Sequence, residues 1–357
     1  LDGGLGADLL VGGDGTGDLV TYQTATGQLV LLLNQGIGGS AETGVDSYVG
    51  VDRWLLGAGS DIVIGAAAAE SVDGGAGDDW MNLGDGNDTL NGGAGGADIL
   101  VAGAGNDLMF GADGDQFYGG DGVDTVNMSG MSVGVAISTG GGWTAVGAGP
   151  GAVYGLINAV EFVFTGAGDD SVYGFTGLTA VSLGGGNDFV ADYSDANNDV
   201  FFGDAGNDAL YGLGGNDVLD GGAGNDFIIG GNGDDTIVGG DGYDWMQGGA
   251  GADVFRYVTA AHSRSSTGVD AISDFARGTD TIDLAGIDAN ALVAGDQAFT
   301  IGVLQAGQAG RLQIILDPAG TPAWAIVQGD VDGDGLADFD LLVFGNVGGL
   351  SGGDFVL

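Results

Sequence analysis

The chain has 357 residues, of which 50 are acidic and only five are basic, so its formal net charge at pH 7 is -45. A charge of this size excludes nucleic acids and anionic membrane surfaces as direct partners, and no apolar run reaches the roughly 18 residues of a membrane span. The chain has no cysteine and 81 glycines, and because each glycine costs about 0.5–1 kcal/mol more backbone entropy than alanine, something other than disulfides has to stabilise the fold.

A nine-residue unit recurs from the start of the chain. Its first copy, GGLGADLLV at residues 3–11, has glycine at the first, second and fourth positions, Asp8 at the sixth and an apolar residue at the eighth. The glycine-rich half suits a tight turn through left-handed backbone conformations, and the last three residues suit a short strand. Because residues 1–17 begin within a repeat, with no methionine or signal segment, we expect a preceding portion of the protein to be missing or removed.

Two stretches interrupt the repeat. Over residues 18–55 the nine-residue period is lost, and an apolar run at 29–33 predicts strands without glycine turns. Residues 128–164 look like a copy of this stretch, since DLVTY at Asp18 corresponds to DTVNM at Asp124, which gives a higher-order period of about 110 residues. We therefore expect two β-rich inserts between three repeat segments.

The repeat returns over residues 56–127 and again over 165–256. Three units of the first block depart from the pattern, with Glu70 at the sixth position, an extra residue before Asp98, and Gln116 at the sixth position of GADGDQFY. The fifth position is often Asn or Asp, which tolerate positive φ better than most residues and so favour a turn. From residue 203 to 256 six units follow without remainder, namely GDAGNDALY, GLGGNDVLD, GGAGNDFII, GGNGDDTIV, GGDGYDWMQ and GGAGADVFR.

The sixth-position aspartates predict a row of metal sites. Two units make one coil with strands on opposite sides, so units two apart stack about 4.8 Å apart and bring like charges together. Carboxylates about 4–5 Å apart repel by roughly 1 kcal/mol even in water, so a hard cation is expected between them. Calcium accepts carbonyl and carboxylate oxygens together, whereas the small octahedron of magnesium fits such a cage poorly.

The three irregular turns depart from this register and are not among the predicted metal sites. The predicted ligands are the carboxylates of Asp8, Asp61, Asp79, Asp88, Asp107, Asp124, Asp170, Asp188, Asp208, Asp217, Asp226, Asp235, Asp244 and Asp253, with the turn carbonyls of Gly222, Gly224, Gly231, Gly233, Gly240 and Gly242.

These units resemble the calcium-binding nonapeptide of RTX proteins, GGxGxDxUx. The resemblance implies an all-β fold, a parallel β-roll in blocks that binds several Ca²⁺ ions. The paired inserts resemble those of large RTX surface proteins and adhesins, which implies a secreted, extracellular location at the cell surface.

Residues 257–357 differ in composition and are expected to form a β domain that caps the roll. The segment 268–288 resembles the end of the RTX block in serralysin-type secreted proteins. DVDGDGLADFD at 330–340 begins like an EF-hand loop but has Leu341 where that loop carries its bidentate glutamate. We expect Asp330, Asp332, Asp334 and Asp338 to bind one further calcium ion. The last four residues, DFVL, resemble the signal read by type I exporters.

The sequence has no metalloprotease signature. The HExxH zinc motif is absent, the single histidine, His262, lies in a polar stretch, and the GxGxxG strings arise from the repeat. We therefore expect a non-enzymatic module that self-associates in an extracellular assembly such as an S-layer, filament or adhesin. The alternative is the secretion and folding tail of an extracellular hydrolase.

Overall fold

The computed structural model describes residues 1–2, 5–13, 17–41, 43–112, 114–132, 134–139, 153–174, 178–193, 197–264, 268–293, 297–318 and 324–357. The chain divides into two compact units, Leu1–Ala180 (unit 1) and Val181–Leu357 (unit 2). Within the described residues every regular element is a β-strand except two short 3-10 helices, η1 (Leu33–Gln35) and η2 (Gly352–Asp354). The chain is all-β, as its repeat predicts, and β19 (Ala180–Ser182) lies at the boundary of the units.

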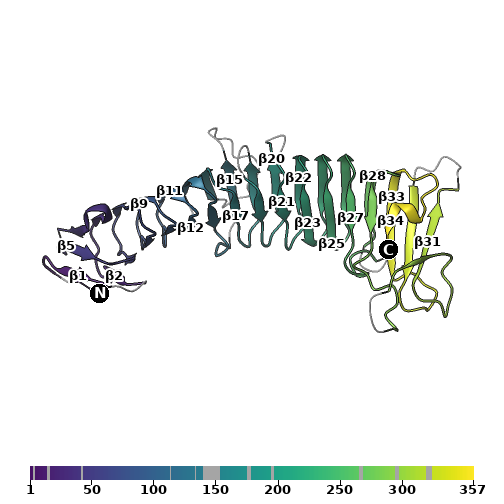
Figure 1. The fold of residues 1–357 in the computed structure, drawn as a ribbon, viewed down its shortest axis with the longest axis horizontal. Coiled ribbons are helices and arrows are strands. Elements are labelled where there is room, and N and C mark those ends of the chain that lie inside the picture. The colour runs from purple at the N-terminus through teal and green to yellow at the C-terminus, as the bar shows by residue number, and fades with distance from the viewer. Residues whose placement is uncertain are drawn as a thin grey trace. The chain divides into compact units, whose positions relative to one another are not determined.

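Unit 2 contains the regular run and forms a parallel β-roll. Successive nonapeptides alternate between two sheets, so that strands two units apart are paired in parallel (Figure 1). Sheet A of this unit begins with β20 (Phe189–Asp192), β22 (Ala209–Gly214), β24 (Phe227–Asn232), β26 (Trp245–Ala250) and β28 (Asp270–Ala276). Sheet B begins with β21 (Val200–Phe202), β23 (Val218–Ala223), β25 (Thr236–Asp241), β27 (Val254–Arg256) and β29 (Thr281–Asp283).

The eighth position of each unit forms the core between these sheets. Leu210 faces Ile228 and then Met246 along sheet A, while Leu219, Ile237 and Phe255 stack along sheet B, and all six side chains are fully buried. The neighbouring seventh and ninth positions point outwards, as alternation along a strand requires. The apolar residue at every ninth step is thus what holds the two sheets together.

The C-terminal residues extend both sheets of unit 2 beyond the last repeat. In sheet A, β33 (Phe339–Asn346) pairs in parallel with β28, and β32 (Trp324–Asp330) and β31 (Arg311–Leu316) continue it in antiparallel order, with β30 (Thr300–Ile301) at the edge. In sheet B, β34 (Phe355–Val356) pairs with β29. These strands therefore cover the edges of β28 and β29.

Unit 1 is built on the same plan with less regular coils. Its sheet B consists of β2 (Leu19–Thr21), β6 (Arg53–Leu55), β8 (Ser71–Asp73), β10 (Thr89–Asn91), β12 (Leu108–Phe110), β14 (Thr125–Asn127) and β17 (Phe162–Phe164). Its sheet A contains β7 (Ile62–Ile64), β9 (Trp80–Asp85), β11 (Ile99–Gly105), β13 (Gln116–Gly122), β16 (Val153–Asn158), β15 (Val135–Thr139) and β18 (Ser171–Gly174), paired in parallel.

The two inserts supply strands to these stacks. In the first, β3 (Val30–Leu32), β4 (Ile37–Ser40) and β5 (Gly44–Val49) are joined in antiparallel order, and β5 pairs in parallel with β1 (Leu9–Val11). In the second, β15 and β16 lie between β13 and β18. Among the described residues, no helix has the length and apolar character needed to cross a bilayer.

Candidate metal sites

The turns of the roll use glycine at two positions where the backbone is left-handed. The second-position residues Gly222, Gly231 and Gly240 have φ of 94°, 120° and 105°, and the fourth-position residues Gly224, Gly233 and Gly242 have φ of 141°, 130° and 147°. Two units have another residue at the second position, Asp204 with φ 67° and Leu213 with φ 69°. The backbone requirement is therefore kept even where the sequence departs from glycine.

The sixth-position aspartates of unit 2 form two ladders. The backbone N–H of each aspartate donates to Oδ1 of the aspartate one coil further on, over 2.8–3.0 Å. One ladder joins Asp188, Asp208, Asp226, Asp244 and Asp270, and the other joins Asp199, Asp217, Asp235 and Asp253. All these side chains are buried, and each regular aspartate thus has one oxygen held by the neighbouring coil.

In several of these carboxylates the second oxygen has no hydrogen-bond partner. Oδ2 is buried and unpaired at Asp217, Asp226, Asp235, Asp244 and Asp253. In unit 1 the same atom is unpaired at Asp61, Asp79, Asp88, Asp107 and Asp124. Because an unpartnered buried carboxylate oxygen costs several kcal/mol, so many in register indicate a positively charged ligand.

The first-position glycine keeps a space open beside each of these oxygens. A Cβ added to Gly221 would lie 2.4 Å from Oδ2 of Asp226 and 2.5 Å from the carbonyl oxygen of Gly239, one coil further on. At Gly230 the corresponding distances are 2.2 Å to Asp235 and 2.7 Å to Gly248. A carboxylate and a carbonyl oxygen therefore face the same small space, a donor set that suits calcium.

The predicted glycine ligands occupy a different place from this first-position carbonyl. The carbonyl oxygens of Gly222 and Gly224 lie 1.9 Å and 1.5 Å from where a Cβ of Gly240 and Gly242 would stand. These carbonyl oxygens point at the equivalent glycines of the next coil, and the carbonyl oxygens of Gly231 and Gly233 likewise point at Gly249 and Gly251. The structure thus places the first-position carbonyls, which are not among the ligands predicted from the sequence, beside the carboxylates.

Burial raises the pKa of the ladder carboxyls. The pKa of Asp226 and Asp253 rises to about 6, and that of Asp235 and Asp244 to about 7, because desolvation disfavours the charged form and neighbouring carboxylates add like charge. In unit 1 the pKa of Asp79 rises to about 7 for the same reasons. A bound divalent cation would oppose this effect by stabilising the ionised carboxylates.

Of the predicted sixth-position aspartates, Asp8 stands apart because its side chain is exposed, while the others are buried. Asp170 accepts the N–H of Val135 at 2.6 Å, and Asp61 accepts that of Leu29 at 2.7 Å. Val135 and Leu29 belong to the inserts. The carboxylate after each insert is therefore tied to a coil within it.

The structure corrects the register of one irregular unit. Gln116 does not occupy the sixth position of GADGDQFY, because Asp115 accepts the N–H of Asp98 at 2.9 Å and is buried, while Gln116 begins β13. Asp98 likewise stays in the ladder and accepts the N–H of Asp79 at 2.7 Å. The inserted residue before Asp98 is absorbed by the turn, so the coils here span 19 and 17 residues.

Other acids join the ladders without a nonapeptide around them. Glu161 accepts the N–H of Asp124 at 2.7 Å, and Asp46 accepts that of Asp8 at 2.9 Å. Asp270 accepts from Asp244, and Asp280 accepts from Asp253 at 3.3 Å. No periodic sequence signal marks these residues, since the regular glycines of the turn are missing.

The fifth position has another role than the one expected. No Asn or Asp at this position has positive φ among the described residues. Instead, Oδ1 of Asn207 accepts the N–H of Asn225 at 2.8 Å, and Oδ1 of Asn225 accepts that of Tyr243 at 3.0 Å. This outer ladder runs in the opposite direction to the aspartate ladder, and together they clamp each turn to both of its neighbours.

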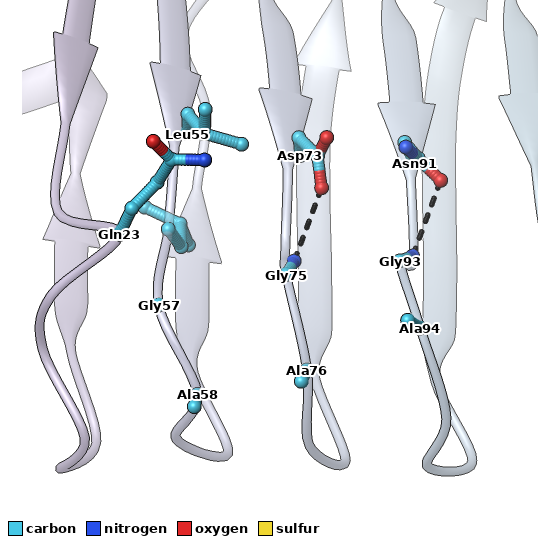
Figure 2. Close-up of a pocket in the computed structure, with 11 residues that line it drawn as sticks. Gln23, Leu55, Gly57, Ala58, Asp73, Gly75, Ala76, Asn91, Gly93 and Ala94 are labelled. Atoms are coloured by element: carbon cyan, nitrogen blue, oxygen red, sulfur yellow. Dashed lines mark hydrogen bonds between the residues drawn. The ribbon is translucent and has the colours of Figure 1, made fainter.

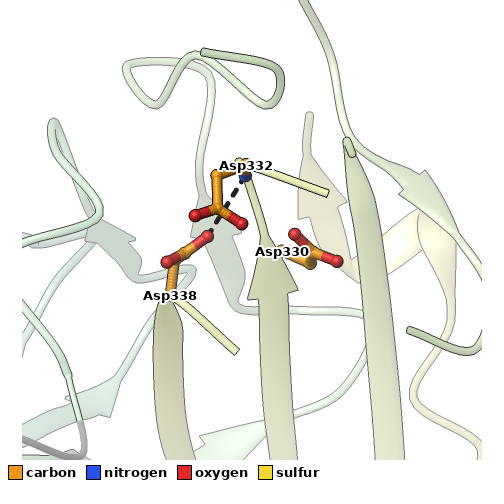
Figure 3. Close-up of side chains that lie close together, drawn as sticks. All are labelled: Asp330, Asp332 and Asp338. Carbon is orange, nitrogen blue, oxygen red and sulfur yellow. Dashed lines mark hydrogen bonds between the residues drawn. The ribbon is translucent and has the colours of Figure 1, made fainter. Parts of the chain in front are cut away.

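The loop after β32 brings together three of its four predicted ligands. Carboxylate oxygens of Asp330, Asp332 and Asp338 all lie within 4.8 Å of one another (Figure 3). Asp334 is outside this group, and its Oδ1 accepts the N–H of Leu336 at 2.7 Å. Backbone N–H groups of Gly333 and Gly335 donate to Asp330 at 2.6 and 2.9 Å. The loop is therefore closed around Asp330 by its own backbone.

A shallow groove of about 440 Å³ follows the turns of unit 1 (Figure 2). Asp73 and Asn91 point along it, and their Oδ1 atoms accept the N–H groups of Gly75 and Gly93, each at 3.1 Å. Its other lining residues are Gln23, Leu55, Leu56, Gly57, Ala58, Ala76 and Ala94. With a single titratable residue among them, the lining offers no acid–base pair.

Comparisons with known proteins identify the nonapeptide repeat. The family model described as the RTX calcium-binding nonapeptide repeat (4 copies) matches residues 64–96, 93–126, 158–190, 193–228 and 229–257. No curated protein matches the chain. Among the similar solved structures are two solution structures of subunits of the Azotobacter vinelandii mannuronan C5-epimerase.

The AlgE6R2 subunit is 26% identical, with 44% of this chain and 91% of that chain covered and a TM-score of 0.32. The AlgE6R3 subunit is 25% identical, with 53% and 77% covered and a TM-score of 0.27. Over the matched residues the chain is built of RTX calcium-binding nonapeptide repeats, and repeats of this kind bind multiple calcium ions.

Proposed function

We propose that this chain is a secreted structural module that folds when it meets extracellular calcium. The observation that carries the proposal is the row of buried, unpaired Oδ2 atoms beside glycines that cannot accept a side chain. Without cations, the ladders and a net charge of -45 oppose the compact state. At ten times its dissociation constant each bound ion adds about 1.4 kcal/mol, so about ten ions add on the order of 14 kcal/mol.

The proposed ligands in the regular run are the sixth-position aspartates with the first-position carbonyls of the neighbouring coil. Asp98 and Asp115 continue the ladder into the irregular part of unit 1, where Oδ2 of Asp115 also accepts the N–H of Ala112 at 2.7 Å. Asp330, Asp332 and Asp338 are the proposed ligands of a separate ion in the C-terminal part of unit 2. Asp334 orders that loop through its bond to Leu336.

Export through a type I exporter is consistent with this chemistry. An unfolded chain suits passage from a cytosol with little calcium to a medium that contains about a millimolar concentration. Phe355 and Val356 of the proposed signal form β34 and complete sheet B in the folded unit. The signal would thus be available only before folding.

Circular dichroism in calcium and in chelator tests the proposal. We expect the β signal to disappear in chelator and to return when calcium is restored, with several ions bound per chain by calorimetry. An unchanged β spectrum in chelator would contradict it.

An exposed apolar patch favours a role in an assembly over a role as the tail of a hydrolase. Leu9 and Val11 of β1 and Val45 and Val49 of β5 are 52–65% exposed, and Leu9 and Val11 lie opposite Ser47 and Val49 in register. Contiguous exposed apolar residues mark interaction surfaces. We therefore assign self-association at a cell surface or in a matrix to this module.

Sedimentation at millimolar calcium separates the two roles. We expect oligomers of the wild-type chain, monomers of the Val45→Ser/Val49→Ser variant, and oligomers of the control Val303→Ser, whose side chain is 74% exposed in unit 2. A wild-type chain that stays monomeric at high concentration would favour the hydrolase tail.

A further inference from the structure

In the first insert, a buried carboxylate of the ladders has its second oxygen bonded to a side chain rather than to backbone. Asp46 in β5 is fully buried, and its Oδ1 accepts the N–H of Asp8 at 2.9 Å, the same bond that the regular aspartates accept. Its Oδ2 accepts the hydroxyl of Tyr22 at 2.5 Å. At Asp226 and its counterparts, by contrast, Oδ2 is unpaired. The hydroxyl of Tyr22 therefore meets the carboxylate oxygen that elsewhere faces an open space.

A second tyrosine completes this cluster. The hydroxyls of Tyr22 and Tyr48 lie 2.6 Å apart, and because Tyr22 donates its proton to Asp46, Tyr48 donates to Tyr22. Both rings are buried, at 3% and 7% exposed, and Tyr48 packs edge-on against Trp54 with ring centroids 6.3 Å apart. A chain of hydrogen bonds in which each member is satisfied is strong and fixes the geometry around it.

The surrounding backbone is shaped for the tyrosines. A Cβ on Gly38 in β4 would lie 2.6 Å from the hydroxyl oxygen of Tyr48, so the absence of a side chain there leaves room for it. Burial and the bond to Asp46 raise the pKa of Tyr22, and burial raises the pKa of Tyr48 to about 12. Both hydroxyls therefore keep their protons at neutral pH and remain donors.

We propose that the first insert builds a coil in which two tyrosine hydroxyls take the place of calcium, so that this part of unit 1 is ordered without the metal. The apolar core around it supports the same conclusion, because Leu29 and Leu31 are fully buried and β3, β4 and β5 pair with one another. Three antiparallel strands with a buried face meet the general requirement for independent stability of a sheet. The calcium-dependent coils would then pair with strands of the insert that are already ordered, since β7 pairs with β3 and β8 pairs with β6.

Hydrogen exchange of the full chain, with and without chelator at pH 7, tests this inference. We expect peptides from residues 44–49 to stay protected in chelator while peptides from residues 218–246 exchange freely. Protection lost equally from both regions would overturn the inference. Protection kept in both would contradict the calcium-dependent fold proposed above, and the variants below would still decide the role of the tyrosines.

Tyr22→Phe leaves Oδ2 of Asp46 buried without a donor, so exchange at residues 44–49 in chelator should rise about ten- to a hundred-fold. Tyr48→Phe should produce a smaller rise, because it leaves the bond from Tyr22 to Asp46 intact. The matched control is Tyr211→Phe, since Tyr211 faces outwards in sheet A of unit 2 and should not change exchange at residues 44–49. Unchanged exchange in Tyr22→Phe would overturn the inference.

Discussion

At the scale of single residues, the fold depends on glycines whose replacement meets a backbone atom. Gly224 combines φ of 141° with a Cβ position 1.4 Å from the carbonyl oxygen of Gly206. No rearrangement of a side chain can relieve that contact, since both partners are backbone. The repeat therefore selects glycine at the fourth position for close stacking as well as for the turn.

We predict that Gly224→Ala destabilises calcium-loaded unit 2 by roughly 2–5 kcal/mol, through left-handed strain and steric overlap together. Chemical denaturation in calcium measures this. Gly353→Ala is the control, because its added Cβ meets nothing within 4 Å and should change stability little. Equal stability of the two variants would show that the coils can move apart.

The raised carboxyl pKa values predict how the calcium-free chain responds to pH. The ordinary pKa of aspartate is about 3.9, whereas burial and like charge bring Asp235 and Asp244 to about 7. Between these values the folded state binds more protons than the unfolded state, so stability falls as pH rises. We expect calcium-free protein to have more β structure at pH 4.5 than at pH 7.5, as circular dichroism can show, and the opposite order would refute the burial of these groups.

At the scale of elements, the sequence predicts the regular coils better than the irregular ones. Each nonapeptide between residues 203 and 256 has its turn and strand where the period predicts them, because local backbone preference and the buried eighth position agree. Where a turn gains or loses a residue, the nine-residue period no longer predicts which acid occupies the ladder position. At Asp98 and Asp115 the turn absorbs the change so that the apolar residues Leu100 and Phe117 stay fully buried.

The fifth-position ladder and the role of the acids in the inserts could not be predicted from the sequence, because the bonded residues are far apart along the chain. The bonds of Asn207 to Asn225 and of Asp46 to Asp8 join residues 18 and 38 positions apart. Only the three-dimensional stacking shows that those backbone N–H groups need an acceptor. The tyrosines near Asp46 likewise give no periodic signal.

The corrected register leads to a prediction about calcium binding. We expect Asp115→Asn to reduce the number of calcium ions bound by unit 1 by about one or two, because each carboxylate faces the coils on both sides. Gln116→Ala is the matched control and should leave the number unchanged, since Gln116 lies in a strand. Titration calorimetry counts the ions, and a loss in the control instead would restore the register read from the sequence.

At the scale of the molecule, each unit is a stack in which a coil contacts mainly its neighbours, so its stability is close to a sum over coils and interfaces. In unit 2 the last interface is formed by β33 on β28 and β34 on β29. Those strands cover Ile272 and Ile282, both fully buried. The C-terminal strands thus stabilise the end of the roll without a nonapeptide of their own.

Deleting residues 324–357 should raise the calcium concentration needed to fold unit 2. Exposure of Ile272 and Ile282 removes about 1.5–3 kcal/mol of burial energy each, which additional calcium binding has to offset. A calcium titration followed by circular dichroism measures the midpoint. An unchanged midpoint would mean that the roll folds independently of its C-terminal strands.

We expect calcium to lie beside the unpaired carboxylate oxygens of the regular coils, and anomalous diffraction from crystals grown in calcium can locate it. We predict an anomalous peak within about 2.3–2.6 Å of Oδ2 of Asp226 and of the carbonyl oxygen of Gly239, repeated at Asp235 with Gly248. A structure in which these Oδ2 atoms accept hydrogen bonds from water or protein, with no anomalous peak along the ladders, would contradict it.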